Sequence, residues 1–270
     1  MSLIEEIVLG ITQGLTEFLP ISSTAHLRIV PAFFGWDDPG AAWTAVVQLG
    51  TMAAVLLYFR DDLLNIARTW LGSLRDPSMR GKLEARLGWY LVIGTIPIAI
   101  FGFIFKDQIE NGGRDLYLIG TMLIVFGFVL LVAEEVGTKS RRLEQITNRD
   151  GVVIGLAQAL ALVPGVSRSG ATISAGLFEG FDRTSAARFS FLLSVPAVVL
   201  SGLFELRHAG TSGGSAGGLV IATLLAFVVG YASIAFLLRY LTSHSTIVFV
   251  AYRVVLGTVV LVLTASGAIS

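Results

Sequence analysis

The chain has 270 residues, of which 54% are hydrophobic and 14% charged, and its formal net charge is zero. Soluble globular proteins carry about 25% charged residues, so this composition predicts a membrane protein. The zero net charge gives no indication of nucleic-acid binding. The lack of cysteine excludes disulfides, thiolate metal sites and cysteine nucleophiles.

Six apolar stretches are long enough, or nearly long enough, to cross a membrane. A bilayer core of roughly 30 Å is crossed by about 20 apolar residues in a helix. We therefore expect an all-α integral membrane protein with about six transmembrane helices. The expected spans are residues 43–59, 87–105, 116–133, 186–206, 218–238 and 246–265.

Two further apolar stretches are interrupted by polar residues. Residues 4–19 are followed by Pro20 and a Ser/Thr run and then by the apolar residues 27–34. Residues 152–163 are followed by a Gly/Ser-rich break and then by residues 171–178. Each pattern is typical of a re-entrant helical hairpin. Non-helical backbone at membrane depth is tolerated only next to protein or a wet cavity, so both breaks should face the interior.

The two hairpins resemble each other. Segment 10–15 shares its Gly, Gln and Leu with segment 155–160 at an offset of 145, and each is followed by a Pro and then a Ser, which pairs Ser23 with Ser167. Three expected spans follow each hairpin. Because three is odd, the second hairpin should enter from the opposite face, which predicts an inverted-topology repeat. We expect one membrane domain over residues 1–270, with repeats at about 1–135 and 150–270.

The distribution of basic residues predicts the orientation. The connections 60–86 and 134–151 are rich in Lys and Arg, whereas the other side holds Lys106, Arg114 and Arg207. Excess Lys and Arg marks the cytoplasm, so both termini and the first hairpin should lie outside. Arg253, near the start of the last span, is expected to extend its charge to the membrane interface.

The second break has the residue types of a phosphate cradle. Glycines allow a backbone to approach a ligand closely, and the N-terminal amides of the following helix favour an anion. Arg168 adds a planar guanidinium that suits phosphate oxygens. Alternatively, Arg168 reaches the interface and the glycines only break the helix. The remaining candidate phosphate-binding residues here are Gly165, Ser167, Ser169, Gly170 and Thr172.

The first break has candidate catalytic groups. Gln13 and Glu17 are four residues apart and share one helix face. A carboxylate buried in a membrane must be paired, protonated or metal-bound. Glu17 is thus a ligand of a hard cation such as Mg²⁺ together with Gln13, a general base, or a partner of Arg168. His26 is a candidate nucleophile, acid/base or orienting group. Candidate nucleophiles or phosphate ligands are Ser22, Ser23 and Thr24.

These motifs closely resemble the two signatures of the undecaprenyl-diphosphate phosphatase family, also called the bacitracin-resistance family. The first signature reads Gln13-Gly-Leu-Thr-Glu-Phe-Leu-Pro-Ile-Ser-Ser-Thr-Ala-His26 and the second Pro164-Gly-Val-Ser-Arg-Ser-Gly-Ala-Thr172. The resemblance covers nearly the whole chain. By position, the family's functional residues fall on Glu17, Ser23, His26 and Arg168. At one family position glutamate is common, but this chain has Gln13 there. Metal binding or base work therefore depends mainly on the single carboxylate of Glu17.

The resemblance implies a membrane hydrolase that converts undecaprenyl diphosphate to the monophosphate, the lipid carrier reused in cell-wall glycan synthesis. It also implies a divalent cation, Mg²⁺ or alternatively Ca²⁺, and a site on the outer, periplasmic side of the bacterial cytoplasmic (inner) membrane. Attack by Ser23, by His26 or by water stays open. A lipid transporter on the same scaffold and an ion-coupled exchanger using Glu17 and His26 are rival hypotheses. The oligomeric state is open, a homodimer included.

Overall fold

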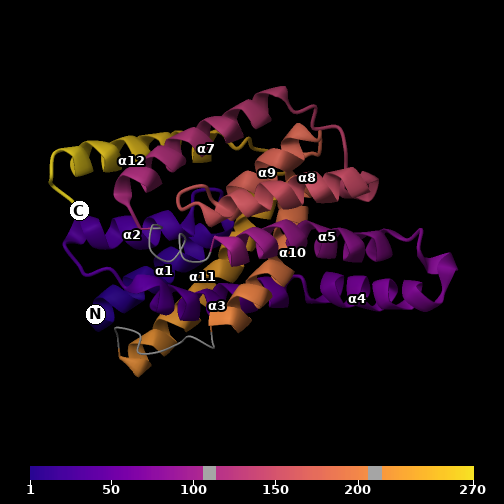
Figure 1. Cartoon of the computed structure of the whole chain (residues 1–270), viewed down its shortest axis with the longest axis horizontal. Coiled ribbons are helices and arrows are strands. Elements are labelled where there is room, and N and C mark those ends of the chain that lie inside the picture. The colour runs from indigo at the N-terminus through magenta and orange to yellow at the C-terminus, as the bar shows by residue number, and fades with distance from the viewer. Residues whose placement is uncertain (106–113, 206–214) are drawn as a thin grey trace.

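The computed structural model describes residues 1–105, 114–205 and 215–270, and this part of the chain is helical, with an isolated bridge between Arg141 and Phe181 as its sole β pairing. Figure 1 shows the arrangement of the helices. The α-helices are α1 (Leu3–Phe18), α2 (Ser23–Phe34), α3 (Gly40–Tyr58), α4 (Arg60–Arg75), α5 (Leu83–Ile104), α7 (Leu116–Val136), α8 (Asn148–Ala159), α9 (Arg168–Phe178), α10 (Arg183–Glu205), α11 (Ala216–Tyr240) and α12 (Ile247–Ala265). Short 3-10 turns are η1 (Pro77–Met79), η2 (Leu143–Gln145) and η3 (Leu160–Leu162).

Five of these helices are long and apolar enough to cross a membrane, namely α3, α5, α7, α11 and α12. They coincide with five of the six expected spans, which confirms an all-α, multi-pass membrane protein. The sixth expected span forms α10, a helix of 23 residues that is not in this group. Its expected last residue, Leu206, lies outside the described residues, as do Lys106 and Arg207.

The basic connection 60–86 contains a helix that the sequence analysis did not anticipate. Helix α4 packs against α5, with the Trp70 and Trp89 rings edge to face at 5.4 Å. Ile66 and Ser73 are the buried residues of α4, and their seven-residue spacing places them on one face. The other faces carry charge, so α4 is amphipathic and lacks the continuous apolar run of a span. The connection between α4 and α5 lies at the end of the molecule opposite the two termini (Figure 1).

The two hairpins occupy equivalent positions in the bundle. Helix α1 packs on α11, and its counterpart α8 packs on α5, while α7 and α12 lie side by side (Figure 1). A Cβ on Gly10 would lie 2.6 Å from the Ala222 carbonyl oxygen, and a Cβ on Gly155 would lie 2.4 Å from the Gly94 Cα. Only glycine allows such an approach. The same glycine thus makes the same helix contact twice. The repeat boundaries and the sides of membrane entry stay predictions.

The first turns of the hairpins also correspond at the offset of 145. Helix α1 begins with a capping box of Ser2 and Glu5, and α8 begins with one of Thr147 and Asp150. Asp150 is buried and pairs with Arg141 at 2.6 Å. Burial opposes the charge of Asp150, but hydrogen bonds from Arg141 and Thr147 outweigh it and hold the pKa of this carboxyl below its usual range. The second hairpin therefore starts from a buried ion pair, and the first from an exposed cap.

Each break ends in a serine with an unusual backbone. Ser22 has φ +75° and Ser167 has φ +72°, in a region that residues other than glycine rarely adopt. Each is an N-cap: the Ser22 hydroxyl accepts from the Ala25 N–H and the Ser167 hydroxyl from the Gly170 N–H. The backbone therefore pairs Ser22, and not Ser23, with Ser167. The pairing inferred from the Pro-to-Ser spacing was wrong by one residue, because that spacing differs between the breaks.

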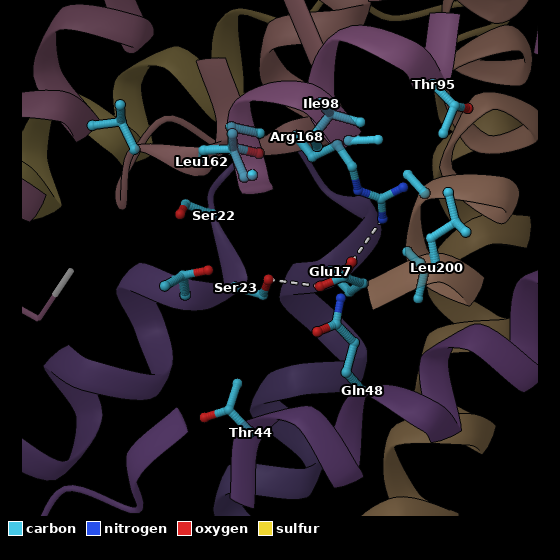
Figure 2. Close-up of a pocket in the computed structure, with 18 of the residues that line it drawn as sticks. Glu17, Ser22, Ser23, Thr44, Gln48, Thr95, Ile98, Leu162, Arg168 and Leu200 are labelled. Carbon is cyan, nitrogen blue, oxygen red and sulfur yellow. Dashed lines mark hydrogen bonds and ion pairs between the residues drawn. The ribbon is translucent and has the colours of Figure 1, made fainter. Parts of the chain in front are cut away.

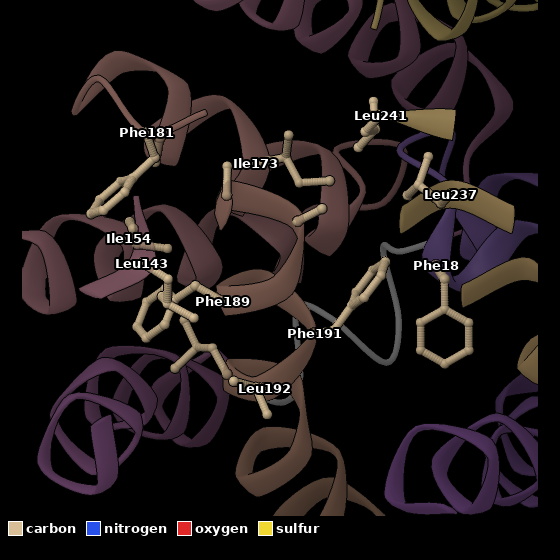
Figure 3. Close-up of a cluster of buried hydrophobic side chains, with 14 of the residues drawn as sticks. Phe18, Leu143, Ile154, Ile173, Phe181, Phe189, Phe191, Leu192, Leu237 and Leu241 are labelled. Atoms are coloured by element: carbon tan, nitrogen blue, oxygen red, sulfur yellow. The ribbon is translucent and has the colours of Figure 1, made fainter. Parts of the chain in front are cut away.

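A core of aromatic and aliphatic side chains fixes the end of α1. Phe18 is 1% exposed and meets Phe191 of α10 edge to face, with ring centroids 5.4 Å apart. Figure 3 shows Phe18 facing Phe191 at one side of a cluster that runs through α9 and α10 to Phe181. Because Phe18 is anchored there, its neighbour Glu17 is held at the end of α1 beside the break.

Candidate active site

A cavity of about 530 Å³ lies between the two breaks. Both hairpins contribute polar groups to it, and the lining contains two charged side chains among the described residues, Glu17 and Arg168. Its other walls come from α3, α5, η3 and α10 and are mostly apolar. The predicted site residues on the lining are Gln13, Glu17, Ser22, Ser23, Thr24, Gly165, Ser167 and Arg168. The cavity therefore joins a polar chamber to an apolar cleft.

Glu17 is the centre of the polar chamber. Its carboxylate accepts a hydrogen bond from the Ser23 hydroxyl at 2.7 Å and another from the Arg168 guanidinium at 2.7 Å (Figure 2). These contacts join the hairpins across 151 positions of sequence. The two breaks therefore meet at Glu17, as the span count predicted. Charge-assisted hydrogen bonds of this kind are shorter and stronger than neutral ones.

Gln13 lies one helical turn before Glu17 and orients it. The Gln13 amide donates to the Glu17 carboxylate at 3.1 Å and, at 3.5 Å, to the Thr51 hydroxyl of α3. The Gln13 Oε1 atom is buried and has no hydrogen-bond partner among the described residues. A buried acceptor without a partner is uncommon and costs free energy. Gln13 therefore offers one free oxygen ligand next to the carboxylate.

Arg168 is the first residue of α9 and brings the second break into the chamber. Its side chain is 14% exposed, and its Nη2 atom binds Glu17. Its Nη1 atom is buried and has no hydrogen-bond partner within the described part of the chain. One half of the guanidinium fork is thus engaged by Glu17, and the other half has no partner among the described residues.

Three predicted phosphate-binding residues have structural contacts instead and do not line the cavity. The Ser169 hydroxyl donates to the Leu19 carbonyl at 3.0 Å and so joins the two breaks. The Gly170 N–H donates to the Ser167 hydroxyl, and the Thr172 hydroxyl hydrogen-bonds the Ser190 hydroxyl at 2.6 Å. Their predicted role in binding phosphate has no support in these contacts.

His26 is also absent from the cavity lining. Its Nδ1 atom is 2.7 Å from the Ser22 carbonyl oxygen, which can only accept, so Nδ1 carries the proton. Its Nε2 atom then accepts from the Tyr252 hydroxyl at 2.6 Å, and the two rings stack at 5.6 Å. The His26 imidazole is thus directed toward Tyr252 of α12. The structure therefore does not place His26 in contact with Glu17, Ser23 or Arg168.

Sequence reasoning missed several residues around the site. Thr44 and Thr95 line the cavity, and neither belongs to either motif. Tyr252, the partner of His26, has no local signal in an apolar helix. Arg253 was expected at the membrane interface, and this expectation was wrong: its side chain is 0% exposed and lies between the two breaks.

The residues present fit a divalent cation that also binds substrate. The described residues contain no group of three His, Cys, Asp or Glu side chains that could hold a metal by themselves. Glu17 and the Oε1 atom of Gln13 would supply two oxygen ligands. Mg²⁺ is commonly bound through one or two carboxylates together with water and substrate phosphates. A site of this type would be completed by the substrate.

Together these features define a class of protein: a multi-pass helical membrane protein with a charged, hydroxyl-rich chamber that opens into an apolar cleft. Residues 6–259 match the family model of the bacitracin resistance protein BacA, so the chain belongs to that family.

Three relatives are similar over nearly their whole length. A protein of Nocardioides sp. named undecaprenyl-diphosphatase is 54% identical, covering 99% of this chain and 98% of the relative. A protein of the same name from Mycolicibacterium smegmatis is 55% identical, covering 100% of this chain and 99% of the relative. Undecaprenyl-diphosphatase 2 of Streptomyces avermitilis is 51% identical, covering 100% of this chain and 97% of the relative.

Proposed function

We propose that this chain hydrolyses undecaprenyl diphosphate to undecaprenyl phosphate and inorganic phosphate, which recycles the lipid carrier for cell-wall synthesis and confers resistance to bacitracin. The name of its relatives supports the substrate. The observation that carries the proposal is the contact of Ser23, Glu17 and Arg168 in one cavity, because it places a hydroxyl, a base and a phosphate-binding cation together.

Ser23 is the proposed nucleophile and Glu17 its general base. The Ser23 hydroxyl already donates to the Glu17 carboxylate at 2.7 Å, within reach for proton transfer. Its oxygen attacks the terminal phosphorus as the proton passes to Glu17, and the bond to the bridging oxygen breaks to release the lipid monophosphate. Water then attacks the phosphoserine, the bond between phosphorus and the Ser23 oxygen breaks, Glu17 returns its proton to that oxygen, and inorganic phosphate is released. His26 supports this site through the Ser22 carbonyl, one residue before the nucleophile.

Arg168 and a divalent cation supply the positive charge that the diphosphate needs. Glu17 and Arg168 cancel each other, so the described lining has no net charge to offer a multiply charged anion. Arg168 binds a phosphate oxygen through its free Nη1 atom. Glu17 and Gln13 are the proposed protein ligands of Mg²⁺ or Ca²⁺, which supplies further charge neutralisation when bound. Phosphoryl transfer depends mainly on such positioning and electrostatic stabilisation.

The proposed location is the cytoplasmic membrane, with the cavity open to the outer side. The lining residues Thr44, Phe103 and Leu200 come from the start of α3 and the ends of α5 and α10. The arginine-rich turn after α4 lies at the end of the molecule opposite the termini (Figure 1). Excess basic residues mark the cytoplasm, which supports an outward opening. Labelling of cysteines introduced at Arg75 and Thr44 tests this: a membrane-impermeant reagent should reach only residue 44 from outside.

Phosphate release by the purified protein in detergent tests the activity. With undecaprenyl diphosphate and Mg²⁺, the wild type should release one phosphate per lipid, and EDTA should abolish the release. A transporter would release none, because detergent leaves no membrane to cross, so an inactive but well-folded wild type would refute the hydrolase. A phosphorylated peptide that contains Ser23 would separate the serine route from phospho-His26 and from direct attack by water.

A further inference from the structure

One charged residue lies deep in the protein outside the proposed chemistry. Arg253 is the sole charged residue of α12, and its side chain is 0% exposed. No carboxylate lies within ion-pair distance of it in residues 1–105, 114–205 and 215–270. Burying a cation without an anionic partner is costly, and charged residues at membrane depth usually serve a function.

The guanidinium of Arg253 is surrounded by backbone carbonyls from three segments. Its Nη1 atom donates to the Pro20 carbonyl of the first break at 3.1 Å. Its Nη2 atom donates to the Gly165 and Val166 carbonyls of the second break at 2.9 and 3.1 Å. The remaining bonds go to α7, from Nη2 to Met122 at 3.3 Å and from Nε to Leu123 at 3.1 Å.

The carbonyls of the two breaks that Arg253 binds lie one or two residues before the two serines with positive φ. Val166 precedes Ser167, and Pro20 is two residues before Ser22. Each serine holds a positive φ that costs of order 1–3 kcal/mol and persists only when its surroundings fix it. The residues that follow, Ser23 and Arg168, are the two that meet at Glu17. Arg253 is therefore a side chain from outside both hairpins that bonds the two segments leading into the site.

We propose that Arg253 is a positioning residue of the phosphatase, whose guanidinium locks the two breaks in the register at which Ser23 and Arg168 both reach Glu17. This inference rests on the proposed function. Lysine cannot replace it, because an ammonium has three donors around one point, whereas the guanidinium presents five in a plane. A loss of register of about 1 Å at a reacting centre can lower a rate about 100-fold.

The first test compares Arg253→Lys with the wild type in detergent, at a temperature well below the melting temperature of each protein. We expect kcat to fall about 100-fold. Inhibition by inorganic phosphate should weaken about tenfold, because Arg168 no longer faces the phosphate site. A purely structural role would lower the melting temperature and leave both quantities unchanged in folded protein. That result would overturn the proposal.

A second variant keeps Arg253 and displaces its guanidinium group. A Cβ on Gly170 would lie 3.1 Å from Arg253 Nη1 and 3.2 Å from Ser167 Cβ, so Gly170→Ala should shift the guanidinium relative to the second break and lower kcat about 3- to 10-fold. The matched control is Gly127→Ala, whose Cβ would lie 3.4 Å from the Cβ of Arg253 and not near the guanidinium. Equal kcat in the two alanine variants would contradict the proposal, even where Arg253→Lys does not fold.

The proposed function and this inference fail in different ways. An inactive wild type refutes the phosphatase. In that event, calorimetric titration with inorganic phosphate alone tests whether Arg253 positions Arg168, because phosphate binding needs no turnover. Arg253→Lys should still bind phosphate more weakly than the wild type, and equal affinity would count against Arg253.

Discussion

The two hairpins share a backbone and differ in chemistry. At the offset of 145, both begin with a capping box, both cross a partner helix at a glycine, and both end in a strained serine cap. Yet Glu17 corresponds to Leu162, and Ser23 corresponds to Arg168. In the proposed mechanism, the first hairpin supplies the nucleophile and the base, and the second supplies the phosphate-binding cation. Neither half contains a complete site.

The largest expected effect comes from removing the base that only the first hairpin has. Glu17→Gln keeps the shape of the side chain but cannot accept the Ser23 proton, so phosphate release should fall about 10²- to 10⁴-fold. The counterpart change, Leu162→Ala, removes apolar cavity lining and should lower activity less than about 10-fold. If the two variants lost activity equally, the division of roles between the hairpins would be refuted.

Phe18 provides the strongest contrast in stability. It is 1% exposed, so Phe18→Ala should lower the free energy of unfolding by about 3–5 kcal/mol. Its counterpart at the offset of 145 is Val163, which is 37% exposed, and Val163→Ala should cost about 1 kcal/mol or less. Thermal unfolding in detergent measures both. A small effect at Phe18 would mean that the core does not anchor the end of α1.

The two strained serines should behave alike. Ser22→Ala loses the hydroxyl cap and keeps the unfavourable φ, which should cost about 1–2 kcal/mol. Ser22→Gly loses the same cap but relieves the φ, so its melting temperature should exceed that of the alanine variant. The pair Ser167→Ala and Ser167→Gly should show the same order. A reversed order at either serine would argue against a positive φ there.

The smallest expected effect is on the pH dependence of stability, and it concerns the first turns of the two hairpins. Because the pKa of Asp150 is lower in the folded protein than in the unfolded chain, its contribution to stability is complete above the ordinary aspartate value near 3.9. The contribution is lost as pH falls through the folded value. Melting temperatures from pH 7 to 3 should therefore fall less steeply for Asp150→Asn than for the wild type. The corresponding cap of the first hairpin, Ser2 with Glu5, is exposed and contains no buried ion pair.

Much of the fold follows from hydropathy, because a span is a continuous apolar run and a re-entrant hairpin is an interrupted one. Helix α4 was missed for the same reason: its apolar residues form one face, and the Arg-rich sequence resembles a loop. The meeting of Glu17 with Arg168 followed from counting spans, which needs no side-chain detail. The one-residue error in pairing the breaks arose because sequence spacing does not report backbone dihedrals.

The roles of individual side chains were harder to predict. His26 was placed with Ser23 by proximity in sequence, but its imidazole bonds the Ser22 carbonyl and the Tyr252 hydroxyl of α12 instead. Tyr252 and Arg253 lie in a helix whose sequence shows only that it is apolar. Their partners are more than 80 positions away, so no local pattern identifies them.

The ion pair between the hairpins also has a consequence for biosynthesis. Arg168 follows Glu17 by 151 residues. At about 5–20 residues per second, a ribosome needs roughly 8–30 s to make that length of chain. During this interval the first hairpin exists without the guanidinium that neutralises it. Burying a charged carboxylate without a cationic partner is costly, and the partner of Glu17 is made only with the second hairpin. The site with Glu17 paired to Arg168 can thus form only after the second hairpin has been made.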